Sequence, residues 1–372
     1  MDSGHSQRRM PGVSVVIPTW NGLDLLKEFL PSVLEACHCY SGNDRNPVQI
    51  VIVDDASNDA TGQWLMSQGF RPAQASQPRL PDPDRHSINL DLIKNETNAG
   101  FAFSCNRGIR LAAHRLVLLL NNDVRISPDA IGKLVGHFDD SEVFAVHCQV
   151  FEMETGRLIG TGKLAGFSRG FIRVHSSYVC CANPDPKSGV PLYSAFAGGG
   201  AAMFDRAKFD LVGGFDDLLS PYYWEDVELS YRAWKRGYKV FYEPAAIATH
   251  RVSSTIGRLD QRAVKVVQQR NRLIFHWVHL HDGSLLASHL MWLILLALTA
   301  PIRLQPWFLV SFFKAIASLP RVLRRREQER QAAKLTDRAV FSLFDQLRND
   351  PGIFPYDRYQ ELVDRGIAPT IN

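Results

Sequence analysis

Over the first 125 residues, short apolar runs alternate with segments in which apolar residues recur at helical spacing. The runs cover residues 13–19, 49–55, 90–93 and 116–120. Apolar runs of this length are typical of strands buried on both faces of a parallel sheet. The helical segments cover residues 23–34, the stretch that opens at 56–59, and 101–113. The alternation predicts an α/β fold with a mostly parallel, doubly wound sheet, and a proline-rich surface loop at 71–87.

Polar clusters end three of these strands, at residues 54–55, 95–100 and 121–123. The carboxyl ends of parallel strands meet at one edge of the sheet, where ligands bind in open α/β folds. Asp123 follows two asparagines and could hold a divalent cation through oxygen ligands. The alternative is a polar turn into a helix that starts at Ser127-Pro128-Asp129. With these polar side chains and a glycine that allows close backbone approach, the edge suits a nucleotide. Because neither G-x-G-x-x-G nor a P-loop is present, we do not expect a Rossmann cofactor there.

The second half of the chain supplies a different set of signals. Residues 151–191 are rich in Gly, Ser and aromatics and predict irregular strands. The glycines at 198–200 leave the backbone bare, so that a sugar or another chain can come close; a flexible turn is the alternative. A helix is predicted to begin near Asp226. Acidic residues there could simply complement the helix dipole, although three aromatics precede them.

Composition narrows the functional classes. The 372 residues carry a formal charge of +4, which is too small to indicate nucleic-acid binding. Six cysteines show no C-x-x-C spacing, and Cys37-His38-Cys39 lies at a predicted helix end without a second ligand pair, so a reduced cytoplasmic protein is expected. Residues 1–10 are polar, which predicts a disordered tail and no secretory signal.

From about residue 256 the composition changes. Residues 284–300 are uncharged and mostly apolar, residues 307–319 are mostly apolar and carry one lysine, and an arginine-rich stretch follows at 321–326. We expect both apolar segments to lie in the membrane interface or re-enter it on the cytoplasmic face, where the arginines meet anionic lipid. The alternative is a buried helical hairpin packed on the catalytic domain or on a second subunit. The predicted domains are therefore residues 11–255 and a helical region at 256–372.

Five motifs in order resemble the GT-A-fold, family 2 inverting glycosyltransferases of bacterial type. They lie at residues 13–21, 51–59, 98–108, 118–124 and 198–250. The family's D-x-D motif falls on Asn121-Asn122-Asp123, where the first carboxylate is missing. This variant, together with Trp224-Glu225-Asp226, is most similar to the rhamnosyl- and galactofuranosyl-type branch. The resemblance implies a donor half at about 11–125 and an acceptor half at about 126–255.

The resemblance also implies roles for single residues. Asp55 would recognise the nucleobase, Asp123 would hold Mg²⁺ or Mn²⁺ against the diphosphate, and His250 would add a second ligand, although a structural histidine is the alternative. The expected donor-binding residues are Pro18, Thr19, Asp54, Asp55, Asn98, Gly100, Asn106, Asn122 and Asp123. The expected acceptor-binding residues are Gly199, Gly200, Trp224 and Glu225. Asp226 would be the general base, with Glu225 orienting the acceptor. A second carboxylate should raise the pKa of its neighbour while the helix start lowers it.

The implied reaction is inverting transfer from a nucleoside-diphosphate sugar, of the dTDP-rhamnose or UDP-sugar type, without a covalent intermediate. The acceptor would be a glycan or a lipid-linked sugar in surface polysaccharide synthesis, at the membrane surface. An oligomer is compatible with the sequence. Two alternatives remain open: a UDP-hexose transferase with a different acceptor, and a degenerate transferase that binds nucleotide-sugars without turnover. The cluster at 270–272 and Arg251 could meet phosphates or be solvated.

Overall fold

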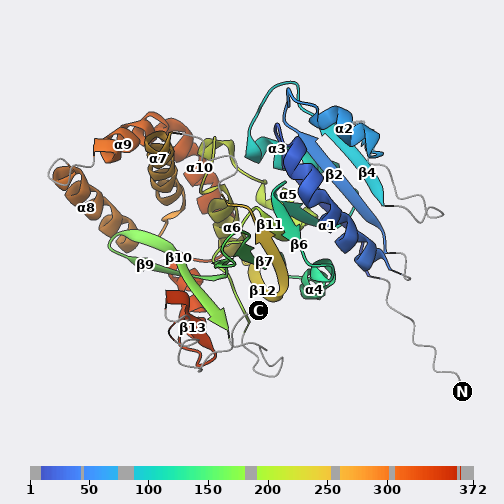
Figure 1. Cartoon of the computed structure of the whole chain (residues 1–372). Helices are drawn as coiled ribbons and strands as arrows, with labels where there is room; N and C mark the ends of the chain where they lie inside the picture. The colour runs from blue at the N-terminus through green and yellow to red at the C-terminus, as the bar shows by residue number, and fades with distance from the viewer. Residues whose placement is uncertain are drawn as a thin grey trace, which may run out of the picture.

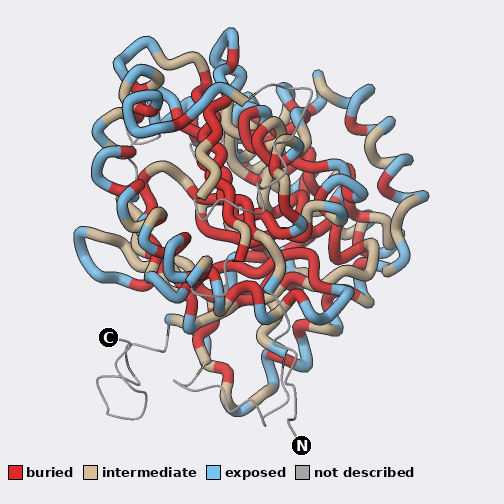
Figure 2. Tube along the Cα trace, turned by 90° about the vertical axis from the view of Figure 1, so that its right-hand side faces the viewer, coloured by how far each residue is buried: buried red, intermediate tan, exposed pale blue. Residues whose placement is uncertain are grey.

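The computed structural model describes residues 10–42, 46–73, 88–180, 191–252, 260–300, 306–357 and 361. Residues 1–9 of the predicted disordered tail and residues 74–87 of the predicted surface loop lie outside the described residues. Buried residues concentrate in the sheet at the centre of the molecule, and exposed ones lie on the peripheral helices and loops (Figure 2).

Within the described residues the main sheet has ten strands, in the order β3-β4-β2-β1-β5-β11-β7-β12-β6, with β8 paired to β7 (Figure 1). Its parallel part is formed by β3 (Arg71–Pro72), β4 (Asn89–Lys94), β2 (Val48–Asp54), β1 (Val13–Thr19) and β5 (Leu116–Leu120). Every residue of β1, β2 and β5 is buried, as expected for strands covered on both faces. The prediction of a mostly parallel α/β sheet is confirmed for this half.

The helices of the parallel half are α1 (Leu23–Ser41), α2 (Thr61–Ser67) and α3 (Phe101–Leu111). Helix α1 continues past the predicted end at residue 34, because Cys37 and Tyr40 extend its buried face. Helix α3 approaches β1 very closely, since a Cβ on Gly108 would lie 2.5 Å from Val16 Cγ1. Glycine at this position therefore sets the helix directly against the sheet, and this fixes where the loop before α3 lies.

The other half of the sheet is antiparallel in part. Its strands are β11 (Ala201–Asp205), β7 (Val143–Glu152), β12 (Lys239–His250), β6 (Val124–Ile126) and β8 (Leu158–Gly160). Strand β11 lies antiparallel between β5 and β7, and β12 lies antiparallel to β6, so the sheet is mixed. Short helices α4 (Ala130–Val135), α5 (Arg206–Val212) and α6 (Glu225–Lys235) connect these strands. The predicted helix start at 127–129 is a turn instead, and α4 begins at Ala130.

A second, three-stranded sheet contains β9 (Gly162–Ser168), β10 (Phe171–Cys180) and β13 (Ile353–Pro355). The strands predicted over 151–191 are therefore present, and β9 and β10 form a regular hairpin with one bulge. Strand β13 comes from the far end of the chain and pairs with β10. This pairing joins the C-terminal region to the part of the chain that precedes α6.

The described residues of the C-terminal region form five helices. They are α7 (Gln261–His279), α8 (Gly283–Thr299), α9 (Pro306–Ala317), α10 (Leu319–Ala332) and α11 (Asp337–Arg348). Asp337, fully buried at the start of α11, pairs with Lys235 at 2.8 Å and accepts from the Tyr231 hydroxyl at 2.8 Å. Both partners belong to α6, so the C-terminal region holds the helix that carries Glu225 and Asp226. Within the described residues, we find no helix with the length and hydrophobicity needed to cross a bilayer.

Candidate active site

The first polar cluster is organised around Asp55, directly after β2. Its Oδ1 accepts hydrogen bonds from Asn95 Nδ2 at 2.6 Å and from the Ala99 backbone N–H at 2.9 Å. Its Oδ2 accepts from the Gly100 N–H at 2.8 Å, and Gly100 has φ of +87°, a conformation that favours glycine. Asp55 thus fixes the loop before α3, on which Asn98 is exposed. A nucleobase contact by Asp55 stays a prediction.

Two neighbouring residues complete this edge of the sheet. Asp54 is buried and its Oδ1 accepts from the Ser57 N–H at 2.9 Å. Its Oδ2 is buried and has no hydrogen-bond partner among the described residues. The ends of β1 and β5 are joined by a 2.8 Å hydrogen bond from Asn122 Nδ2 to Thr19 Oγ1, and Pro18 is buried just before Thr19. The predicted donor residues of β1, β2 and β5 therefore do meet at one edge.

Asp123 and His250 lie side by side, as a shared metal site requires. Strand pairing places His250 opposite Val124, and His250 Nε2 is 3.1 Å from Asp123 Oδ1. The Asp123 backbone carbonyl also accepts from the Arg251 N–H at 3.1 Å. In the part of the chain that the structure describes, no group of three or more His, Cys, Asp or Glu side chains converges on one point. Among the described residues, one carboxylate and one imidazole therefore lie together at this point.

The glycine run at 198–200 connects this edge to the carboxylate pair. The Gly200 carbonyl accepts from the Asn121 N–H at 3.0 Å, and a Cβ on Gly200 would lie 2.9 Å from Asn121 Nδ2. The Gly199 backbone N–H is close enough to the Asp226 carboxylate to lower its pKa. The bare backbone thus admits the protein's own Asn121 side chain, and it links the end of β5 to the start of α6.

Glu225 and Asp226 begin α6, after a turn in which Tyr223 and Trp224 have φ of +70° and +76°. Non-glycine residues in this region are strained, so the turn needs support. Asn271 of α7 supplies it, because its Nδ2 lies 3.0 Å from the carbonyl oxygens of both Tyr222 and Tyr223. The sequence around Asn271 gives no sign of this role.

From the sequence, Arg251 and the arginines at 270 and 272 could either meet phosphates or be solvated. In the structure their side chains contact other parts of the protein. Arg270 donates to the Ser220 carbonyl at 2.9 Å, and the Arg272 guanidinium lies 4.3 Å from the centre of the Phe171 ring. Arg251 pairs with Glu28 at 2.6 Å. These contacts hold the loop before α6 and the surface beside His250.

Burial dominates the protonation of the carboxylate pair. It raises the pKa of Glu225 to about 8, with the Asp226 charge as the second cause. Burial also raises the pKa of Asp226, while the backbone N–H groups of Val227 and Gly199 oppose the shift. Glu225 Oε2 is buried without a hydrogen-bond partner among the described residues. Near neutral pH, Glu225 therefore keeps a proton, and Asp226 is the member of the pair whose charged form the backbone donors favour.

Two of the expected site residues direct their side chains into the protein. The Asn106 amide bonds to the Phe215 N–H at 2.9 Å and to the Phe215 carbonyl at 2.8 Å. The Trp224 ring is buried, 5.5 Å from His175 and 5.2 Å from Phe275. Of the three aromatic residues before Glu225, only the half-buried Tyr222 and Tyr223 therefore keep accessible surface.

Glu225→Gln tests the protonation of the pair. In the unfolded chain this carboxyl ionises near pH 4.5, but in the folded protein its pKa is about 8. Between these values only the folded state keeps the proton, so rising pH lowers the free energy of unfolding, by up to about 1.4 kcal/mol per pH unit. Urea unfolding from pH 5 to pH 8.5 should show a flatter profile for Glu225→Gln than for the wild type. The exposed Glu35→Gln is the control; equal slopes for all three proteins would contradict the protonated Glu225.

Two family profiles match overlapping parts of the chain. The family described as Glycosyl transferase family 2 matches residues 14–182, and the one described as Glycosyl transferase family group 2 matches residues 116–319. Poly-beta-1,6-N-acetyl-D-glucosamine synthase of Staphylococcus aureus is 22% identical over 261 residues, which are 70% of this chain and 54% of the synthase. The chain thus spans about half the length of that relative. Protein y4gI of Sinorhizobium fredii, named as uncharacterized, is 26% identical over a region that covers 67% of this chain and 25% of the length of y4gI.

Among solved structures, that of GalNAc-T7 with UDP, GalNAc and Mn²⁺ superposes with a TM-score of 0.54. It covers 74% of this chain and 49% of that one, at 17% identity. A likeness at this level of identity concerns the fold, and it agrees with the GT-A architecture expected from the sequence.

Proposed function

This chain belongs to Glycosyl transferase family group 2 and is a glycosyltransferase, and we propose that it is an inverting one. In this proposal the enzyme moves a sugar from a nucleoside diphosphate to a glycan or lipid-linked acceptor and inverts the configuration at the anomeric carbon. The half-buried Glu225–Asp226 pair, in which burial raises both pKa values, is the observation that carries this proposal. A carboxylate with a raised pKa is a stronger base than one in water, and inverting transfer needs a base for the acceptor hydroxyl.

In the proposed mechanism each half of the site has one task. Asp226 takes the proton from the acceptor hydroxyl as its oxygen attacks the anomeric carbon, and the protonated Glu225 donates a hydrogen bond to the acceptor. The anomeric C–O bond to the diphosphate breaks, and the nucleoside diphosphate leaves at the edge formed by β1, β2 and β5. Asn121, Gly200 and Gly199 connect the two halves through the backbone contacts described above, so base and donor are positioned together.

A divalent cation would neutralise the charge that develops on the leaving diphosphate. Asp123 and His250 would hold it, and the diphosphate oxygens and water would complete its coordination. An imidazole beside a carboxylate fits Mn²⁺ better than Mg²⁺, which prefers oxygen ligands and bound water. GalNAc-T7 was solved with Mn²⁺, so Mn²⁺ is the first ion to test.

For the donor we propose dTDP-rhamnose or a UDP-sugar, in surface polysaccharide synthesis of the rhamnosyl- or galactofuranosyl-type. The name of the staphylococcal relative adds UDP-N-acetylglucosamine to the candidates, because that protein builds an N-acetylglucosamine polymer. A UDP-hexose transferase with another acceptor and a binder without turnover are the competing functions.

Donor-dependent nucleotide release separates these functions. The full-length protein is incubated with Mn²⁺ and each of dTDP-rhamnose, UDP-galactofuranose, UDP-glucose and UDP-N-acetylglucosamine, with and without a lipid-linked glycan. We expect nucleotide to be released from only one of these four donors, and to be released faster when the acceptor is present. Saturable binding of a donor with no release would identify the degenerate transferase.

We further propose that the protein works at the cytoplasmic face of a membrane. Exposed large apolar side chains gather on α8 and on α9–α10, where they recur every three or four residues. On α8 they are Leu290, Met291, Ile294, Leu295 and Leu298, and on α9–α10 they are Trp307, Val310, Phe313, Ile316, Leu319 and Leu323. Together these residues are called the apolar face below. An interfacial helix pair with such a face would bring the site to a lipid-linked acceptor in the bilayer plane.

The nearby arginines contribute less than the sequence suggested. Arg325 pairs with Asp216 at 2.8 Å, and Arg326 donates to the carbonyls of Trp277 and Leu280. Arg324 and Lys314 are exposed and would meet anionic lipid, at about 1 kcal/mol each. Apolar burial would therefore be the larger part of membrane binding.

The triple variant Ile294→Asp, Leu298→Asp, Phe313→Asp tests the apolar face. These side chains are 63%, 71% and 65% exposed, so the changes should leave the fold intact. In a flotation assay we expect the wild type to bind vesicles containing anionic lipid and the variant to stay unbound. High salt should release the wild type only partly, because apolar burial is not screened.

Leu211→Asp, at an exposed leucine of α5, is the matched control. Donor-dependent nucleotide release should be unchanged in both variants. A wild type that ignores vesicles and forms a dimer lost in the triple variant would show that a second copy covers this face.

A further inference from the structure

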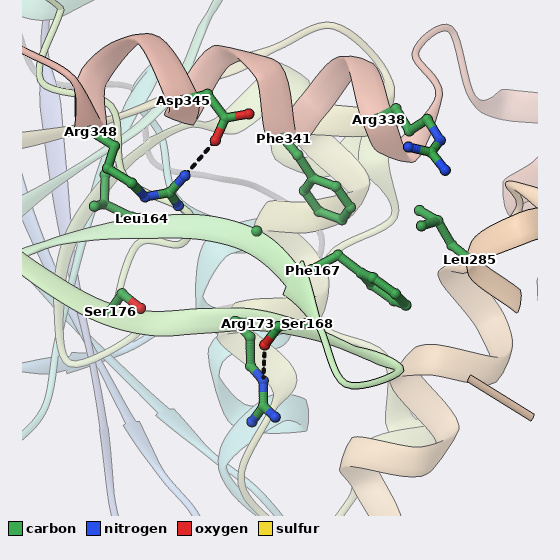
Figure 3. Close-up of a pocket in the computed structure, with 11 residues that line it drawn as sticks. Leu164, Phe167, Ser168, Arg173, Ser176, Leu285, Arg338, Phe341, Asp345 and Arg348 are labelled. Carbon is green, nitrogen blue, oxygen red and sulfur yellow. Dashed lines mark hydrogen bonds and ion pairs between the residues drawn. The ribbon is translucent and has the colours of Figure 1, made fainter. Parts of the chain in front are cut away.

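A cavity of about 500 Å³ lies between the β9–β10 hairpin, α11 and the beginning of α8 (Figure 3). This volume is in the range of small-ligand pockets. Its apolar part contains Leu164, Leu285 and the rings of Phe167 and Phe341, which stack with centroids 6.4 Å apart at 25°. None of these residues belongs to the transfer site described above.

Three arginines surround the aromatic pair. Arg173 comes from β10, and Arg338 and Arg348 come from the two ends of α11 (Figure 3). The lining has a single carboxylate, Asp345, which pairs with Arg348. The cavity therefore has an excess of two positive charges beside an apolar wall.

The arginines keep hydrogen-bonding capacity for a ligand. Arg173 donates from Nε to Ser168 at 3.2 Å, and Arg338 donates from Nη2 to Ser284 at 2.9 Å. Each guanidinium has five N–H donors in a planar fork, so these contacts leave donors that match a phosphate or a carboxylate. Ser168 and Ser176 in the lining add hydroxyls suited to sugar oxygens.

The bulge in β10 connects this cavity to the transfer site. Arg173 pairs with Gly166 and Ser176 with Leu164, so one residue of β9 lies opposite two of β10. Arg173 and Ser176 consequently face the cavity, whereas His175 lies against Trp224, next to Glu225. The same strand therefore carries the cavity on one face and supports the carboxylate turn on the other.

We propose that this cavity is a second saccharide site, which binds a phosphate- or carboxylate-bearing segment of the acceptor glycan. The guanidinium groups would hold the anion, and the Phe167–Phe341 wall would take the apolar face of a sugar ring. The assignment of the ligand to the acceptor rests on the proposed function; the binding site itself does not.

Binding of defined probes to the full-length protein tests the site. The probes are an oligoglucuronate, a phosphodiester-linked oligosaccharide and a neutral oligosaccharide of equal length, titrated by calorimetry at low and high salt. We expect one or both anionic probes to bind, the neutral one to bind much more weakly, and added salt to weaken binding. Which anionic probe binds distinguishes phosphate from carboxylate recognition.

The double variant Arg173→Gln, Arg338→Gln should weaken anionic binding by about 10–100-fold or more, as expected for the loss of two charge-assisted contacts. Arg262→Gln, Lys265→Gln, at exposed positions of α7, removes the same charge and should bind as the wild type. Thermal unfolding confirms that both variants are folded. No anionic binding by the wild type, or equal loss in both double variants, overturns the site.

Donor-dependent nucleotide release by the same preparations keeps this test separate from the proposed function. Release that persists while anionic binding fails overturns the cavity proposal alone. Anionic binding by a wild type that releases no nucleotide overturns the transferase mechanism and the acceptor assignment, and leaves a saccharide site.

Discussion

Asp226→Asn is expected to lower kcat by about 10²–10⁴-fold, the usual contribution of a general base. Asparagine keeps the size of the side chain, and its oxygen can still accept from the Val227 N–H, which lies 2.8 Å from Asp226 Oδ1. It cannot take a proton from the acceptor. Donor affinity should change little, because the proton comes from the acceptor hydroxyl and not from the nucleotide.

Steady-state kinetics with donor binding measured separately decides this prediction, and Glu225→Gln is the matched variant. Glu225 is expected to act as the protonated partner, so glutamine should retain much of kcat and affect mainly the acceptor KM. When the pH is lowered, the wild-type kcat should fall with an apparent pKa above the ordinary aspartate value, because burial raises the pKa of Asp226. Normal turnover by Asp226→Asn together with an inactive Glu225→Gln would exchange the two roles.

The parallel half of the fold was predictable because its signals are local. Each strand there is a buried apolar run, and the polar clusters at the strand ends meet because parallel strands share an edge. The bond from Asn122 to Thr19 and the closeness of Asp123 to His250 agree with the expected donor edge. The pattern of apolar and polar positions carries this information without any knowledge of distant contacts.

What the sequence analysis missed depends on pairings between distant segments. Strand β13 has three residues and pairs with β10, more than 170 positions earlier, so no local period marks it. Asn271 supports the turn at Tyr223 from another helix, and nothing around residue 271 indicates which carbonyls it faces. Asn106 matched a family motif, yet a motif does not give the direction of an amide, and this one points to Phe215.

Burial decided a question that charge alone left open. From sequence, the neighbouring carboxylate and the helix start oppose each other in setting the pKa of the pair at 225–226. The structure adds desolvation by burial as the largest cause for both residues. The depth of a residue below the surface is a tertiary property, so the direction of these pKa shifts could not be predicted from the sequence.

Asp123→Ala is expected to weaken both Mn²⁺ and donor binding, by more than the roughly 10–100-fold that the loss of a second-shell partner typically costs. The structure offers one carboxylate and one imidazole at this point, so removing Asp123 leaves His250 without the charged ligand. Turnover should fall in parallel, because the leaving diphosphate loses its counter-charge. The measurement is a titration of Mn²⁺ followed by its paramagnetic resonance signal, with donor binding measured in Mn²⁺ and in chelator.

His250→Ala and Asp129→Asn make the assignment specific. His250→Ala should lower Mn²⁺ affinity less than Asp123→Ala, because a neutral ligand contributes less charge than a carboxylate. Asp129 lies at the surface beyond β6, where it pairs with Lys133, and its variant should bind Mn²⁺ as the wild type does. If the wild type binds donor equally well in chelator, or if Asp123→Ala retains full Mn²⁺ binding, Asp123 is a turn residue that orders the end of β5 and the cation has no site here.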